Sequence, residues 1–137
     1  MRFRVQAMKT PQELGGLPDN ELSKILAAMN GWEFCIRART KHGKPLPWAM
    51  EHCRHPYYTC GRWRPMCRMV KYARDLNACH DVALGLDRDQ RNSYINRLDE
   101  MVLDSMDDED RVRRDFEWCC ATPRQRTIAL ILTLQKP

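Results

Sequence analysis

Residues 121–135, ATPRQRTIALILTLQ, carry the strongest folding signal in the chain. Thr122 has the side chain of a helix N-cap, Pro123 suits the first helical position, and Gln125 completes a capping box. The residues that follow are apolar on nearly every side of the expected helix. A helix of this kind is buried all round, so we expect it at the centre of the molecule.

Three further segments combine an N-cap residue with apolar residues at helical spacing. We expect helices that start at Asp19 or Asn20 in residues 18–32, at Asp75 in residues 74–86, and at Asp87 in residues 87–103. The first of these helices should end at the Asn-Gly pair of residues 30 and 31, because these two residue types readily adopt the left-handed conformation that closes a helix.

Strand signals are weaker. Residues 32–39, WEFCIRAR, alternate loosely between apolar and polar side chains and form the first strand candidate. Residues 61–72 form the second, in which Pro65 indicates an edge strand or a break. Residues 114–121 form the third. A small sheet covered by helices would bury the apolar faces of all these elements. We therefore predict an α+β fold in which residues 1–137 form a single compact domain. Its small antiparallel or mixed sheet would be sandwiched by about four helices.

Two regions are expected to be irregular. Residues 1–10 should form a flexible N-terminal arm, and their lack of an apolar core argues against a secretion signal. Residues 40–60 include three prolines and a glycine and should form a long irregular basic loop. The longest apolar run, residues 128–132, is too short for a membrane span. The seven cysteines are expected to be mostly reduced thiols in a cytoplasm.

Charge is distributed unevenly along the chain. The net charge is +5, but residues 36–74 hold ten lysines and arginines against one acid. Residues 75–117 hold thirteen acids against six arginines. Such asymmetry bears on the partners of a protein rather than on its fold.

Three short motifs occur together: Gly31-Trp32, DLNACHD at residues 75–81, and ATPRQRTIALILTL at residues 121–134. As a set they resemble a family of small phage and prophage proteins with a phage ABA sandwich-type domain, in which a sheet lies between helical layers. In that family a Gly-Trp opens the first strand, and the other two motifs open a central helix and the last helix. The resemblance covers roughly residues 19–134.

The resemblance implies a viral origin and action in the host bacterial cytoplasm, but no reaction. Residues 41–67 depart from the family because they are longer, more basic and richer in cysteine and histidine than its usual linker. We therefore expect the individual function of this protein in that segment.

Residues 51–67, EHCRHPYYTCGRWRPMC, contain the candidate site residues, and two interpretations are open. The first is a zinc site, which would supply folding energy to a loop with little apolar surface. Its expected ligands are Cys53, His55, Cys60 and Cys67. The second is a contact surface, since arginine and aromatic residues are frequent in interfaces with proteins and nucleic acids. Its expected contacts are Tyr57, Tyr58, Arg62, Trp63, Arg64 and Arg68.

The leading functional hypothesis is a phage accessory protein that binds stoichiometrically to a host protein or ribonucleoprotein complex and inhibits a defence system such as a CRISPR–Cas effector. The alternatives are a zinc-stabilised nucleic-acid-binding protein and a protein that sequesters a nucleotide signal. We do not expect an enzyme. The adjacent Cys79 and His80 would point about 100° apart on a helix, and no phosphate-binding loop or hydrolase motif is present.

Overall fold

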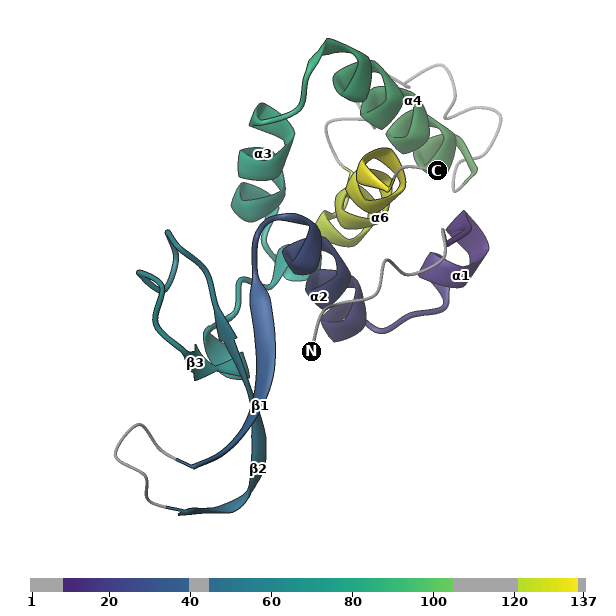
Figure 1. Cartoon of the computed structure of the whole chain (residues 1–137). Coiled ribbons are helices and arrows are strands. Elements are labelled where there is room, and N and C mark those ends of the chain that lie inside the picture. Colours follow the sequence, from purple (N-terminus) through teal and green to yellow (C-terminus); the bar gives the residue numbers. More distant parts are fainter. Residues whose placement is uncertain (1–8, 40–44, 105–120, 136–137) are drawn as a thin grey trace.

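The computed structural model describes residues 9–39, 45–104 and 121–135, and within them it confirms the α+β class (Figure 1). The α-helices are α1 (Pro11–Gly15), α2 (Asp19–Met29), α3 (Leu76–Leu84), α4 (Arg88–Asp104) and α6 (Pro123–Leu134). Two short 3₁₀ helices are η1 (Met66–Arg68) and η2 (Tyr72–Arg74). The strands are β1 (Glu33–Arg39), β2 (Pro45–Arg54) and β3 (Arg64–Pro65).

Helix α6 lies at the centre of the helical body, as its sequence predicted. It packs against α1, α2, α3 and α4, and every residue from Thr127 to Leu132 is buried. Leu22 and Leu26 of α2 and Leu98 of α4 are also completely buried in the same core. Burial of a leucine side chain contributes about 1.5–3 kcal/mol, so these contacts are the main source of stability in the described part of the chain.

Three of the predicted helix starts are confirmed by their hydrogen bonds. The cap expected at Asp19 or Asn20 is wrong, because α2 begins at Asp19 directly after Pro18 and has no side-chain capping hydrogen bond. Thr122 and Gln125 form a complete capping box at α6. The Asp75 side chain accepts from the backbone N–H of Ala78 at 3.1 Å, and Asp87 accepts from that of Gln90 at 2.8 Å. Each cap satisfies a backbone donor that has no partner within its helix.

The three strands form an antiparallel sheet in the order β1-β2-β3. Figure 1 shows the helices gathered at one end of this sheet, with the hairpin of β1 and β2 extending away from them. Within the described residues the sheet therefore does not lie between two helical layers, unlike the expected sandwich. With a third strand of two residues and Ile36 of β1 73% exposed, the sheet offers little apolar surface for a second layer.

The prediction of a long irregular loop over residues 40–60 is wrong for residues 45–54, because these residues form β2. Both prolines of this strand occupy positions that a sheet tolerates. Pro45 is the first strand residue, and Pro47 lies where the pairing of β1 with β2 shifts register. Proline removes a backbone donor, which matters little at a strand start or an irregularity.

Lys9 and Thr10, the described residues of the predicted flexible N-terminal arm, are held in place by hydrogen bonds. The backbone N–H of Lys9 donates to Oε1 of Gln135 at 3.1 Å, and the Gln135 side chain donates to the Lys9 carbonyl at 2.8 Å. Thr10 then caps α1. Residues 1–8 and nearly all of the third expected strand lie outside the described residues. No helix in the described ranges is long and apolar enough to cross a membrane.

Candidate partner-binding surface

His55 lies directly after β2 and fixes the turn that follows. Its Nδ1 accepts from the backbone N–H groups of Tyr57 at 3.0 Å and Tyr58 at 3.2 Å. Its Nε2 lies 2.9 Å from the carbonyl oxygen of Asn30. Because Nδ1 is the acceptor, the neutral ring carries its proton on Nε2 and donates it to Asn30. His55 thus ties this turn to the C-terminal end of α2.

Thr59 closes the same turn. Its hydroxyl accepts from the backbone N–H of His55 at 2.9 Å and donates to the His55 carbonyl at 3.0 Å. The N–H groups of Thr59 and Gly61 also point to that carbonyl. Cys60 and Gly61 both have positive φ, at 54° and 74°, a conformation that is uncommon for cysteine. The turn is therefore shaped by polar contacts within itself.

The Gly31-Trp32 pair supplies the other side of this contact. Gly31 has φ +85°, and a Cβ placed there would lie 3.5 Å from Nε2 of His55. Trp32 is buried, and its indole N–H donates to the Tyr72 hydroxyl at 3.2 Å. Burial raises the pKa of Tyr72 to about 12. The glycine turns the chain from α2 into β1, and the tryptophan anchors that turn in the core.

Tyr58 covers Trp32, and Tyr57 packs against Tyr58 and reaches solvent. Tyr58 stacks on Trp32, with ring centroids 5.6 Å apart and planes 15° apart, and Tyr57 meets Tyr58 edge-on at 5.3 Å. Tyr57 is 80% exposed. Partial burial raises the pKa of Tyr58, and the carboxylates of Asp81 and Asp75 raise it further.

Trp63 has a partner within the fold. The guanidinium carbon of Arg54 lies 4.4 Å from the centre of the Trp63 ring. The Arg54 side chain also donates twice to Oε2 of Glu33, at 2.9 and 2.7 Å, and Glu33 and Arg54 face each other across β1 and β2. Trp63 is half-buried, so this expected contact residue also supports the edge of the sheet.

Four cationic side chains follow the turn and are exposed, and none of them forms an ion pair with a described residue. They are Arg62, Arg64, Arg68 and Lys71. Arg64 begins the edge strand β3, and Arg68 ends η1 directly after it. Together with the two tyrosines they define what we call the loop surface: Tyr57, Tyr58, Arg62, Arg64, Arg68 and Lys71.

The four expected zinc ligands are not brought together as a set. Cys53 is buried, its thiol lies 3.6 Å from the Pro65 carbonyl, and burial raises the pKa of that thiol. Cys60 and Cys67 are exposed, while both ring nitrogens of His55 have partners in the fold. Within the described ranges, no three His, Cys, Asp or Glu side chains are grouped to hold a metal. Zinc binding stays a prediction.

Cys79 and His80 diverge on α3. The Cys79 side chain is completely buried, with its sulfur 3.0 Å from the Tyr72 carbonyl and 3.4 Å from the Thr127 hydroxyl. Burial raises the pKa of this thiol. His80 is exposed, so the imidazole is at the surface while the thiol is in the core.

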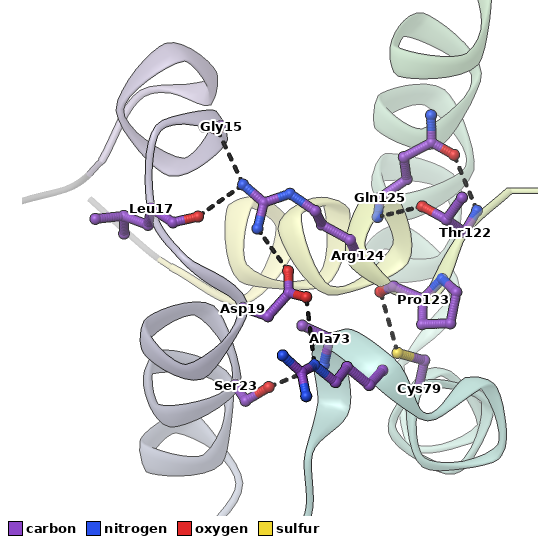
Figure 2. A network of polar contacts seen from close by, with 11 residues as sticks. Gly15, Leu17, Asp19, Ser23, Ala73, Cys79, Thr122, Pro123, Arg124 and Gln125 are labelled. Carbon is purple, nitrogen blue, oxygen red and sulfur yellow. Dashed lines mark hydrogen bonds and ion pairs between the residues drawn. The ribbon is translucent and has the colours of Figure 1, made fainter.

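A second polar network links elements of the helical body (Figure 2). The Arg124 side chain of α6 donates to Asp19 at 2.7 Å and to the carbonyls of Gly15 and Leu17 at 2.9 and 2.7 Å. Arg74 approaches the other oxygen of Asp19 at 3.5 Å. The hydrogen bond from Arg124 is the main cause that lowers the pKa of Asp19. This network joins the start of α6 to the connection between α1 and α2.

The expected contacts through the tyrosines and arginines stay a prediction, and sequence reasoning missed the role of His55. No local signal pointed to that role, because the bond joins His55 to Asn30, 25 positions away. No protein-family model, curated protein or solved structure matches the chain, and its resemblance to small phage proteins stays a prediction.

Proposed function

We propose that the protein acts by stoichiometric binding through the loop surface, without catalysis. The observation that carries this proposal is the pinned turn after β2. His55 and Thr59 hold its backbone, while Tyr57 extends into solvent. The exposed cations that follow the turn in the chain have no acidic partner among the described residues. A surface that is ordered before binding loses less conformational entropy on association, which favours affinity.

The partner in this proposal is a host protein or ribonucleoprotein of a defence system, such as a CRISPR–Cas effector. Two arguments support it. The resemblance to small phage proteins implies a viral origin and a place in the host bacterial cytoplasm, and arginine and tyrosine are residue types enriched in binding hot spots. Exposed cations that lack an acidic partner within the described residues also favour a partner with an acidic or phosphate-bearing surface.

The test is a plaque assay in bacteria that carry a CRISPR–Cas effector targeting the infecting phage. Expression of the protein should raise the plating efficiency of that phage, and Arg62→Glu should remove most of the gain. Arg88→Glu is the matched control, because Arg88 is an exposed arginine on α4 outside the loop surface. Unchanged plating with every effector type tested would overturn the proposed partner, and equal effects of the two variants would overturn the surface.

A further inference from the structure

We propose that the loop surface binds a single-stranded nucleic acid, with bases stacking on Tyr57 and phosphates contacting Arg62, Arg64 and Arg68. This inference deepens the proposed function and rests on the same surface. It specifies that the loop surface contacts the nucleic-acid strand of the ribonucleoprotein partner. The protein subunits of that partner contribute less to the contact.

Tyr57 has the geometry of a stacking platform. The ring is 80% exposed and meets Tyr58 only edge-on, at an interplanar angle of 84°. Tyr58 in turn stacks on Trp32, whose indole is hydrogen-bonded in the core. The platform is thus exposed at one end and anchored at the other. Aromatic platforms of this kind accept any unpaired base, because every base has a π face.

The backbone that carries Tyr57 is fixed before a ligand arrives. Its N–H donates to Nδ1 of His55, and the same ring donates through Nε2 to Asn30 at the end of α2. Gly31, with φ +85°, turns the chain directly after this contact in the left-handed conformation that favours glycine. A strand that binds here therefore loses its own freedom but does not have to order the turn.

Exposed charge supplies the phosphate contacts. Four exposed cations lie within residues 62–71, and none of them forms an ion pair with a described residue. The phosphates of a bound strand are attracted to these side chains. Bases within a duplex are already stacked on one another, so this arrangement favours a single strand.

The test uses the full chain and a fluorescein-labelled oligouridine longer than a site of about 4–16 nucleotides, with fluorescence anisotropy from low to moderate salt. Three to four phosphate contacts predict a slope of log affinity against log salt of about −2 to −3. Tyr57→Ala should weaken binding about 5- to 150-fold, while Tyr57→Phe should retain it. Arg62→Glu should weaken binding and flatten the slope, and Arg88→Glu should do neither.

Two outcomes would overturn the inference: unaltered affinity in Tyr57→Ala, or binding of a duplex of the same length as tightly as the single strand. The plaque assay separates this failure from that of the proposed function. If Arg62→Glu removes the plating gain but the wild type binds no oligouridine, the partner is contacted through its protein and the inference fails alone. If oligouridine binds but plating never changes, the defence role fails alone.

Discussion

The helical body and the loop surface are both organised by a polar side chain that bridges two segments, but their surroundings differ. In the body, Arg124 joins α6 to Asp19 and to the carbonyls before it, beside an α6 segment that is buried from Thr127 to Leu132. In the loop, His55 joins the turn after β2 to Asn30, beside Tyr57, which is 80% exposed.

This difference separates stability from presentation. Apolar burial holds the body, and its ion pair adds to contacts that already exist. The turn after β2 is held by a few hydrogen bonds and by the ring contacts of His55 and Tyr58 with Trp32. Damage to the body should therefore unfold the protein, whereas damage to the loop should change the binding surface and leave the body folded.

The largest effect is expected from Leu130→Ala in α6. Leu130 is completely buried at the centre of the body, and the substitution leaves a cavity as well as lost apolar contacts. We expect the free energy of unfolding to fall by about 2–5 kcal/mol, measured by urea denaturation followed by circular dichroism. The matched control is Leu84→Ala on α3, since Leu84 is 63% exposed and should change stability by less than about 0.5 kcal/mol. Equal losses in the two variants would contradict the central position of α6.

The capped starts of α3, α4 and α6 could be predicted because each depends on neighbours in sequence, whereas α2 begins after Pro18 without a side-chain cap. Thr122 and Gln125 are three residues apart, as are Asp75 and Ala78, and the capping bonds form between them. The apolar pattern of residues 127–132 likewise indicated burial without reference to any other segment. Local signals of this kind are complete within one turn of helix.

The loop could not be predicted in the same way, because its contacts join distant residues. The bond between His55 and Asn30 spans 25 positions, and β2 is recognisable only through its pairing with β1. A histidine in a stretch rich in cysteine suggested a metal ligand, whereas the fold uses both of its nitrogens as hydrogen-bonding groups. The exposure of Tyr57 and of the arginines could be expected because it depends less on distant contacts, while their role in binding stays a prediction.

An intermediate effect is expected from His55→Ala. The change leaves the N–H groups of Tyr57 and Tyr58 without their acceptor and removes ring contacts at 5.1 Å with Trp32 and 4.9 Å with Tyr58. Because solvent can reach these N–H groups, we expect a loss of only about 1–2 kcal/mol. Hydrogen exchange should show faster exchange at Tyr57 and Tyr58 with little change in α6.

The control for this prediction is His80→Ala, which removes an exposed histidine from α3 and should alter neither exchange nor stability. Loss of protection from hydrogen exchange throughout the body in His55→Ala would show that the body and the loop unfold as one cooperative unit. Damage to the loop would then not leave the body folded. Retained protection at Tyr57 and Tyr58 would show that Thr59 alone holds the turn.

The smallest effect is expected from the ion pair of the body, and it should appear only as a dependence on pH. The hydrogen bond from Arg124 lowers the pKa of Asp19 in the folded state, while the pKa of an aspartate in an unfolded chain is about 3.9. Below that value the unfolded state binds more protons, so the stabilisation is present above about pH 4 and is lost as the pH falls through the folded pKa.

Asp19→Asn removes this titration, so its melting temperature should lie below that of the wild type at pH 7 and converge with it in acid. Both partners are about one-third exposed, so the difference should be small and should shrink as salt is added. Asp89→Asn on α4 is the control, because Asp89 forms no ion pair with a described residue. A difference between wild type and Asp19→Asn that stays constant from pH 7 into acid would mean that Asp19 acts as a helix-terminus hydrogen-bonding group and not as the charged partner of Arg124. The body would then be held, like the turn at His55, by contacts that need no charge.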